Sequence, residues 1–244
     1  PGQLRSQWYR FLLEHRVNPT NIYSQSPAPD FEHMAECVAN GLNAFNLRCI
    51  GPIGSETEAQ DLAEFLRGYT LRLRERGWFS RAYVYGFDEA QPEAYEALRR
   101  AYSLIKRTVP DLPRVCTVAP TPELFGCVNV WVPLTADYRQ EDAAERGRNG
   151  EEVWWYICLD PKHPYANWFV DYPAIEPRLL FWMTWKYGVT GFLYYALDMW
   201  ASNRMADGLP DCFVPHEDEK ALEAIRQGKR WPDVPWNTLT YSHH

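Results

Sequence analysis

Segments with the apolar spacing of amphipathic helices alternate with short runs of β-branched and aromatic residues along most of this chain. The helical spacing is clearest in residues 62–73 and 95–105. Strand-like runs cover residues 17–23, 44–50, 81–87, 114–118, 127–132, 153–159 and 191–197. This alternation predicts βαβ units and a parallel sheet, because parallel strands need a long crossover, usually a helix, between them.

The number of strand-like runs favours an α/β fold of the (β/α)8 TIM-like barrel type that lacks its first strand in this piece of sequence. No strand pattern precedes the first helical one, so we expect the missing strand to lie upstream of Pro1. We predict that residues 1–204 form the barrel domain. Residues 205–244 are rich in Pro, Asp and Trp, and we expect them to form a C-terminal extension that packs on the barrel.

Two adjacent carboxylates, Asp88 and Glu89, stand between the strand-like run 81–87 and a helix that Pro92 begins. In parallel α/β proteins the carboxyl ends of the strands carry the catalytic residues. Two acids there can divide glycoside hydrolysis, since one exchanges a proton while the other stabilises positive charge. The alternative is that they cap the helix. Neighbours in a regular strand point to opposite faces, so a shared pocket requires irregular backbone at positions 86–90.

Other side chains predicted to lie at the same end of the barrel suit sugar binding. Aromatic residues make up 15% of the chain, with 11 Trp and 15 Tyr, and flat rings can stack on a sugar, although large rings also fill cores. Strand alternation places Trp154 and Tyr156 on one face. The candidate substrate-binding residues are His15, Arg48, Trp131, Trp154, Tyr156, Asn167, Tyr195 and Trp200. For His15 and Arg48 the alternative is an ion pair with an acid, and for Asn167 it is a turn.

Charge and cysteine spacing argue against several classes of protein. The net charge of -7 argues against a nucleic-acid partner, because phosphates require a basic surface. No apolar run approaches the roughly 20 residues of a membrane span. None of the six cysteines has the spacing of metal ligands, and we expect neither a metal nor a cofactor.

Several motifs follow one another between Arg81 and Trp200. They are Gly86-Phe-Asp-Glu89, Val153-Trp-Trp-Tyr-Ile-Cys158 with Pro161 and Tyr165-Ala-Asn167, Arg178 with Trp182, and Gly191-Phe-Leu-Tyr-Tyr195 followed by Trp200. In these motifs and in their order the chain resembles the catalytic domain of glycoside hydrolase family 123. Two positions depart from the family pattern: Ala90-Gln91 delays the proline expected directly after the acids, and Tyr195 stands where Trp is expected.

The resemblance implies a β-N-acetylgalactosaminidase that works by substrate-assisted retention, in which the 2-acetamido oxygen of the substrate attacks the anomeric carbon. Carried over by position, Glu89 would be the general acid/base and Asp88 would orient the 2-acetamido group. The substrate would be a glycan or glycoconjugate that ends in a β-linked N-acetylhexosamine. The resemblance also favours a secreted or periplasmic protein. Because the sequence begins at Pro1 without Met and lacks a first strand, we expect further domains upstream in the same polypeptide.

Two other functions stay open at this point. The chain could be a retaining glycosidase in which Asp198 or Asp160 is the nucleophile, at the separation from Glu89 that a covalent intermediate requires. It could also be a non-catalytic barrel whose aromatic residues bind carbohydrate. A covalent adduct with a fluorinated sugar would identify the first, and sugar binding without turnover would identify the second.

Overall fold

The computed structural model of this chain describes residues 2–20, 22–23, 30–169 and 172–195. The chain divides into two compact units, each treated separately below. The first unit comprises Pro1–Val132 and Glu141–Val153, and the second comprises Pro133–Gln140 and Trp154–His244. The second unit is described as far as Tyr195, so the expected extension over residues 205–244 lies outside the described residues.

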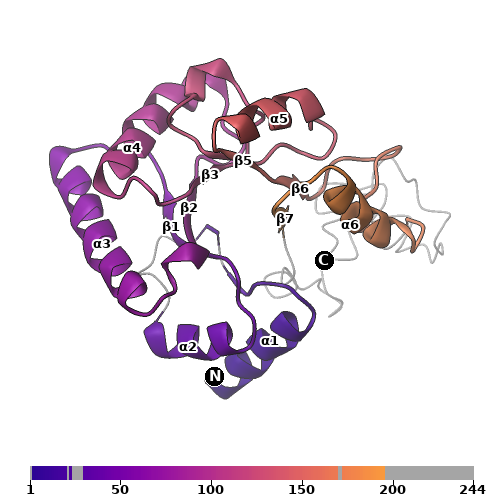
Figure 1. The fold of residues 1–244 in the computed structure, drawn as a ribbon, viewed down its shortest axis with the longest axis horizontal. Coiled ribbons are helices and arrows are strands. Elements are labelled where there is room, and N and C mark those ends of the chain that lie inside the picture. Colours follow the sequence, from indigo (N-terminus) through magenta and orange to yellow (C-terminus); the bar gives the residue numbers. More distant parts are fainter. Residues whose placement is uncertain (1, 21, 24–29, 170–171, 196–244) are drawn as a thin grey trace, which may run out of the picture. The chain divides into compact units, whose positions relative to one another are not determined.

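The first unit is built on a five-stranded parallel sheet whose strands pair in chain order. The strands are β1 (Phe45–Ile50), β2 (Ala82–Gly86), β3 (Arg114–Cys116), β4 (Val130–Trp131) and β5 (Glu152–Val153) (Figure 1). The crossover helices are α3 (Glu56–Glu75), α4 (Tyr95–Thr108) and α5 (Gln140–Arg148). Short 3-10 helices, η1 (Phe79–Arg81), η2 (Pro92–Ala94) and η3 (Pro122–Leu124), join some of these elements.

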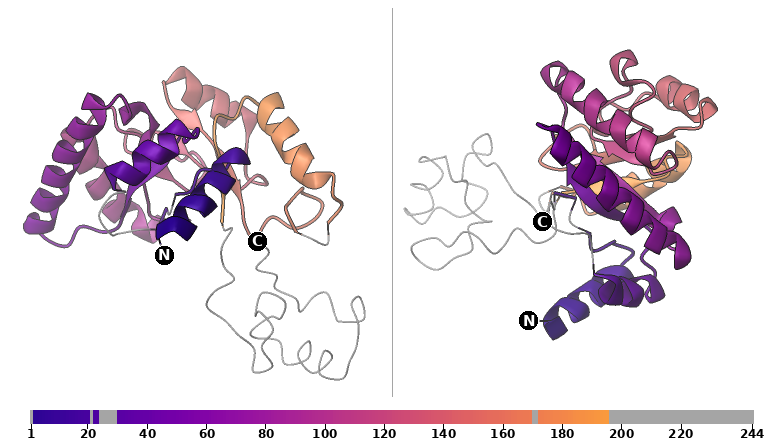
Figure 2. Two further views of the ribbon diagram at one scale, coloured as in Figure 1. Left: turned by 90° about the horizontal axis from the view of Figure 1, so that it is seen from below. Right: turned by 90° about the vertical axis from the view of Figure 1, so that its left-hand side faces the viewer.

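Strands that pair in chain order, with helices between them, are typical of a barrel-type β/α sheet, whereas a doubly wound sheet reverses its order at a switch point. Figure 2 shows α3 and α4 running side by side. The prediction of an α/β protein with a parallel sheet is confirmed. Closure of the strands into a (β/α)8 barrel stays a prediction.

The helix ends follow the local sequence signals. The helix α2 (Phe31–Ala39) begins after Asp30, whose carboxylate accepts hydrogen bonds from two backbone N–H groups of the first turn. It ends before Gly41, which has a φ of 101°, and α3 ends before Gly77, which has a φ of 68°. In the first unit α2 packs against α1 (Gly2–Glu14).

The expected strand over residues 17–23 is absent from the described part of that segment. The segment runs beside β1 but is held by side-chain hydrogen bonds in place of a ladder. The backbone N–H of Asn46 donates to Oγ1 of Thr20 over 3.1 Å, and its Nδ2 donates to the carbonyl of Ile22 over 2.9 Å. Pro19 explains part of the difference, because it has no N–H to give to a ladder.

The second unit contains one parallel βαβ unit within the described residues. Its strands are β6 (Trp155–Ile157) and β7 (Phe192–Tyr194), which pair from Trp155 with Phe192 to Ile157 with Tyr194. The helix α6 (Glu176–Lys186) lies between them in the chain and ends before Gly188, which has a φ of 66°. None of the described helices of either unit is long and apolar enough to cross a bilayer.

The run 153–159 was expected to be one strand, and this expectation is wrong. Strand β5 ends at Val153 and β6 begins at Trp155, so Trp154 interrupts the extended run. A Cβ atom on Gly191 would lie 2.2 Å from the ring of Trp154, so that ring packs directly on glycine backbone. Simple alternation therefore gives no reason to place Trp154 and Tyr156 on one face.

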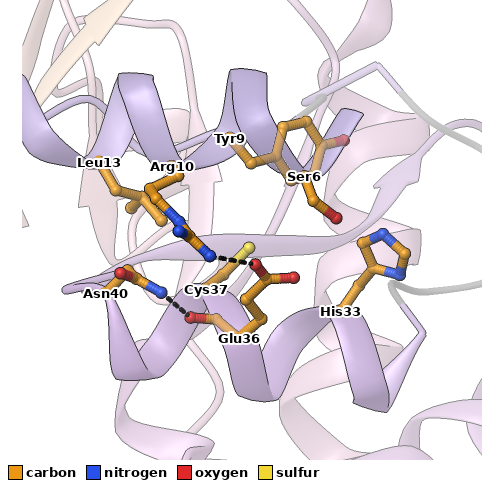
Figure 3. A pocket seen from close by; sticks show the side chains of 8 residues that line it. All are labelled: Ser6, Tyr9, Arg10, Leu13, His33, Glu36, Cys37 and Asn40. Carbon is orange, nitrogen blue, oxygen red and sulfur yellow. Dashed lines mark hydrogen bonds and ion pairs between the residues drawn. The ribbon is translucent and has the colours of Figure 1, made fainter. Parts of the chain in front are cut away.

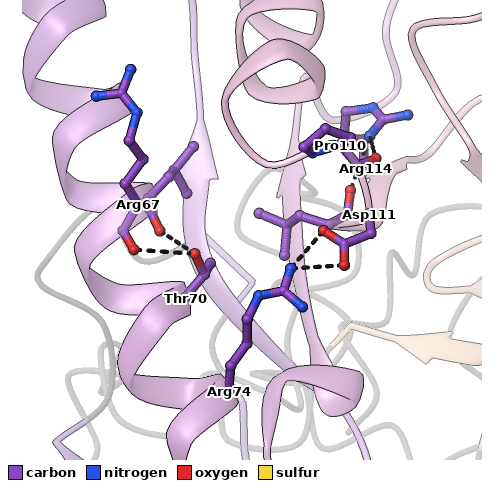
Figure 4. Close-up of polar contacts among 8 residues, drawn as sticks. Arg67, Thr70, Arg74, Pro110, Asp111 and Arg114 are labelled. Carbon is purple, nitrogen blue, oxygen red and sulfur yellow. Dashed lines mark hydrogen bonds and ion pairs between the residues drawn. The ribbon is translucent and has the colours of Figure 1, made fainter.

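Polar contacts stabilise the amino-terminal side of the β3 region. In α3, Nη2 of Arg74 lies 2.6 and 2.7 Å from the two carboxylate oxygens of Asp111 (Figure 4). Arg114 is 3% exposed, and it donates to the carbonyls of Cys127 and Leu112 over 2.6 and 3.0 Å. Burial lowers the pKa of this guanidinium from its usual value. Both guanidinium groups therefore have partners within the protein.

Candidate active site

Both acids leave the sheet at the carboxyl end of β2. The strand ends at Gly86, and the chain then turns through Phe87 and Glu89, which have φ values of 53° and 47°. The irregular backbone predicted for positions 86–90 is confirmed. A Cβ atom on Gly86 would lie 2.1 Å from the carbonyl oxygen of Ile50. The close approach of β1 therefore requires glycine at position 86. The left-handed backbone conformations belong to Phe87 and Glu89 instead.

The carboxylate of Asp88 accepts hydrogen bonds from three hydroxyl groups. Its Oδ1 accepts from Tyr85 and, over 2.9 Å, from Thr117, while its Oδ2 accepts from Tyr23 over 3.0 Å. Tyr85 belongs to β2, Thr117 follows β3, and Tyr23 comes from the segment beside β1. The residue is nevertheless exposed. Asp88 is thus fixed in position by three separate parts of the chain while it remains accessible to a ligand.

The side chain of Tyr85 is fully buried, and its hydroxyl donates to this carboxylate. Burial and, after it, the hydrogen bond to Asp88 raise the pKa of the Tyr85 hydroxyl far above its usual value. The hydroxyl therefore stays protonated across the working pH range of proteins and remains a neutral donor. Its oxygen also lies 3.1 Å from Oγ1 of Thr117.

The side chain of Glu89 is exposed, but its backbone is tied down on both sides. Its N–H donates to Oγ1 of Thr117 over 2.7 Å, and its carbonyl accepts from Nε2 of Gln91 over 3.0 Å. An accessible carboxyl group on a fixed backbone can exchange protons with a bound molecule. Asp88 and Glu89 thus present two exposed carboxyl groups on one turn.

Helix capping does not account for these acids. The N-cap residues of η2 and α4 are Gln91 and Ala94, and neither helix has a side-chain cap. Asp88 instead uses both of its oxygens on hydroxyl groups. The structure therefore removes the alternative that the sequence left open for the pair.

Two thiols lie close to the carboxylate. Burial and, after it, the negative charge of Asp88 raise the pKa of the Cys49 and Cys116 thiols, that of Cys116 to about 12. The Sγ of Cys116 also donates to the carbonyl of Phe87 over 3.4 Å. A thiol whose pKa is raised by burial is a poor nucleophile, so neither cysteine is suited to attack a substrate.

His15 and Arg48 make local contacts. His15 is exposed in the turn after α1, and its Nδ1 lies 2.8 Å from the carbonyl oxygen of Phe11. The guanidinium of Arg48 lies 5.9 Å from the ring centre of Phe65 in α3. The register of β1 shifts within residues 46–49, and such a bulge reorients the side chains in it. Strand counting could not anticipate this bulge, so a contact of Arg48 with sugar stays a prediction.

Trp131 packs in the interior of the first unit. Its side chain is 0% exposed, its Nε1 donates to Oε2 of Glu151 over 2.7 Å, and its ring meets that of Phe125 edge to face. These contacts match the core-packing alternative, since the polar tip of the indole already has a partner.

Asn167 has the contacts of a turn residue. It is 1% exposed, its Nδ2 donates to the carbonyls of Cys158 and Pro161 over 3.2 and 3.0 Å, and its Oδ1 accepts from the N–H of Trp168 over 2.6 Å. An amide satisfied by backbone on both sides has little left to offer a sugar. The turn role is therefore the one that the contacts support.

The remaining candidates belong to the second unit. Tyr156 is 8% exposed, Trp154 is half-buried, and Tyr195 is 41% exposed. Asp160 is exposed, and the other proposed nucleophile, Asp198, lies outside the described residues together with Trp200. Their roles beside Asp88 and Glu89 stay predictions.

The structure adds three residues that the sequence did not single out, Tyr23, Tyr85 and Thr117. A signal was available for Thr117, because it stands at the end of the strand next to β2, where a parallel sheet collects its functional side chains. Tyr85 could have been inferred from its place in the strand that precedes the acids. Tyr23 had a similar signal, because it stands at the end of the run 17–23 that was expected to be a strand.

A pocket elsewhere in the first unit lies between α1 and α2 (Figure 3). It is lined by Ser6, Tyr9, Arg10, Leu13, His33, Glu36, Cys37 and Asn40. Some of its polar groups bind one another: Nη2 of Arg10 lies 3.2 Å from Oε1 of Glu36, and Nδ2 of Asn40 donates to the carbonyl of Glu36 over 2.8 Å. Among the described residues, no group of three or more His, Cys, Asp or Glu side chains is arranged to hold a metal ion.

A parallel β/α sheet with an accessible pair of carboxyl groups at the carboxyl end of a strand defines a class of α/β proteins that catalyse reactions at that edge. The profile of the family described as "Glycoside hydrolase 123, catalytic domain" matches residues 41–231. The chain therefore belongs to the catalytic domain family of glycoside hydrolase family 123, as its motifs indicated.

A solved structure shows a similar fold. A family 123 glycoside hydrolase from Clostridium perfringens, studied for glycolipid glycan hydrolysis, matches with a TM-score of 0.54 and 16% identity over 71% of this chain. The match covers 36% of that protein, so this chain spans about a third of its length. A protein from Silicibacter pomeroyi DSS-3, assigned as a glycerophosphoryl diester phosphodiesterase, matches with a TM-score of 0.37 and 16% identity over 67% of this chain and 51% of its own. No curated protein matches the chain.

Proposed function

We propose that this domain hydrolyses the glycosidic bond of a terminal β-linked N-acetylhexosamine, preferably N-acetylgalactosamine, by substrate-assisted retention. One observation carries the proposal: the carboxylate of Asp88 is held by three hydroxyl groups directly beside the accessible Glu89. Membership in a glycosidase family supports the class of reaction. The Clostridium perfringens relative acts on glycolipid glycans, which favours a glycoconjugate as the substrate here.

Asp88 is suited to receive the N–H of the 2-acetamido group. A carboxylate oxygen has two lone pairs, and Oδ2 accepts one hydroxyl hydrogen bond, from Tyr23, among the contacts of the described residues. Because the carboxylate is already fixed, little reorganisation is needed when a substrate binds. Orienting the N–H turns the acetamido carbonyl oxygen towards the anomeric carbon, where it must attack.

Glu89 is suited to transfer the proton. As the bond from the anomeric carbon to the leaving oxygen breaks, the Glu89 carboxyl gives its proton to that oxygen, and the acetamido oxygen bonds to the anomeric carbon. The product of this step is an oxazolinium. The Glu89 carboxylate then takes a proton from a water molecule, whose oxygen attacks the anomeric carbon and releases the acetamido group with retained configuration.

A screen of 4-nitrophenyl β-glycosides with the full natural polypeptide tests the proposal. We expect release of nitrophenol from the N-acetyl-β-galactosaminide, less from the N-acetyl-β-glucosaminide, and at least about 1,000-fold less from the plain β-galactoside, because that substrate lacks the attacking group. Full activity on the plain β-galactoside would reject substrate assistance. A stable adduct of a 2-fluoro sugar on Asp160 or Asp198 would identify a protein nucleophile instead. Sugar binding without any turnover would indicate a non-catalytic domain that binds carbohydrate.

A further inference from the structure

A single hydroxyl group links the two acids. Thr117 directly follows β3 and is 6% exposed. Its Oγ1 accepts a hydrogen bond from the N–H of Glu89 over 2.7 Å and donates one to Oδ1 of Asp88 over 2.9 Å. It also lies 3.1 Å from the hydroxyl of Tyr85. A hydroxyl can accept and donate at once, which neither an ammonium group nor an ionised carboxylate does.

The turn that carries the acids needs such a tie. Phe87 and Glu89 both have positive φ values, a backbone conformation that is unfavourable for residues with a side chain. A turn of this kind persists when contacts from outside it hold it in place. Thr117, directly after β3, supplies two of those contacts, one to the N–H of Glu89 and one to the carboxylate of Asp88.

We propose that Thr117 is a positioning residue that sets the orientation of Asp88 and Glu89 relative to each other. It exchanges no proton with the substrate and acts through the two acids. The inference rests on the proposed function, since the reaction that it serves is the one described above. Misplacement of a reacting group by about 1 Å can cost about 100-fold in rate, so loss of the hydroxyl should lower kcat more than it changes KM.

Three substitutions separate positioning from general packing. Thr117→Val keeps the shape of the side chain and removes the hydroxyl, whereas Thr117→Ser keeps the hydroxyl. Thr70→Val is the matched control, because Thr70 is 3% exposed and its Oγ1 donates to the carbonyl of Leu66 within α3 (Figure 4). It removes a buried hydroxyl of the same kind away from the acids.

The first measurement is turnover of 4-nitrophenyl N-acetyl-β-galactosaminide by the full polypeptide. We expect Thr117→Val to lower kcat about 30- to 100-fold with KM within about threefold, while Thr117→Ser and Thr70→Val keep kcat within about threefold of the unmodified protein. A kcat for Thr117→Val within threefold of the unmodified value, in a protein that Glu89→Gln inactivates, would overturn the inference.

The second measurement does not depend on turnover. Hydrogen exchange at the Glu89 amide should be at least about tenfold faster in Thr117→Val than in the unmodified protein, because that N–H loses its acceptor. Thr117→Ser should restore slow exchange, and Thr70→Val should not affect it. Unchanged exchange in Thr117→Val would overturn the inference. If the unmodified protein cleaves no 2-acetamido glycoside, the proposed function fails, and exchange still decides whether Thr117 holds the turn.

Discussion

The hydroxyl of Tyr23 lies 3.0 Å from Oδ2 of Asp88, although 65 positions separate the two residues in the chain. The Tyr23 ring also meets that of Tyr85 edge to face, with their centres 5.8 Å apart. The family profile begins at residue 41, so Tyr23 reaches the acid pair from outside the matched range. The amino-terminal segment therefore takes part in the candidate site.

Removing this hydroxyl should weaken catalysis by a modest amount. In Tyr23→Phe we expect kcat/KM to fall about 3- to 10-fold, because the net value of one hydrogen bond is about 0.5–1.5 kcal/mol and Tyr23 is exposed, so water can replace it. Steady-state kinetics on the N-acetyl-β-galactosaminide give this value. A loss above about 100-fold would show that Tyr23 does more than hold Asp88.

Replacing the proposed proton donor, Glu89, should greatly slow turnover without unfolding the protein. We expect Glu89→Gln to lower kcat by about 100- to 10,000-fold, since the amide cannot give up a proton as a carboxyl group does. Its side chain is exposed, so the thermal midpoint should stay within a few degrees. Glu93→Gln is the control, because Glu93 is an exposed glutamate in η2, four positions further along. Equal loss in both variants would contradict a specific role for Glu89.

Tyr85 should make stability depend on alkaline pH. Its pKa is raised in the folded state, so below about pH 10, the usual tyrosine value, both states are protonated and its contribution is fully present. Above that pH the unfolded state loses the proton and the folded state keeps it. The free energy of unfolding then falls by about 1.4 kcal/mol per pH unit for this residue.

Tyr85→Phe should therefore reduce the slope of the free energy of unfolding against alkaline pH by the equivalent of about one proton. It should also lower the free energy of unfolding at pH 7 by about 1 kcal/mol through the lost hydrogen bond. Urea midpoints measured between pH 7 and pH 11 test both effects. Burial also raises the pKa values of Tyr83 and Tyr102, so part of the slope should remain. An unchanged slope in Tyr85→Phe would show that its hydroxyl titrates normally.

Gly86→Ala should destabilise the first unit. A Cβ atom there would lie 2.1 Å from the carbonyl oxygen of Ile50, so β1 and β2 must move apart at the end that carries the acids. We expect a loss of about 3 kcal/mol in the free energy of unfolding. Gly68→Ala is the matched control, because Gly68 lies within α3 with open space around its added methyl group, and it should gain about 0.5–1 kcal/mol. Equal effects of the two changes would contradict the close approach.

Local signals in the sequence predicted most elements, because helix ends depend on nearby residues such as Asp30 and Gly77. The pair Asp88 and Glu89 was predicted by its place between strand and helix. The partners Thr117 and Tyr23 were not, since tertiary structure brings them to the pair from distant segments. The burial and hydrogen bonds of Trp131 and Asn167 could not be predicted for the same reason, because they depend on residues that the local sequence does not identify.

The three groups that hold Asp88 are neutral hydroxyls, and the described residues show no ion pair with its carboxylate. Dissolved salt screens attraction between charges and has little effect on such contacts. The geometry of the acid pair should thus be the same in dilute buffer and in brine. An acid pair held in this way keeps its alignment across surroundings of very different ionic strength.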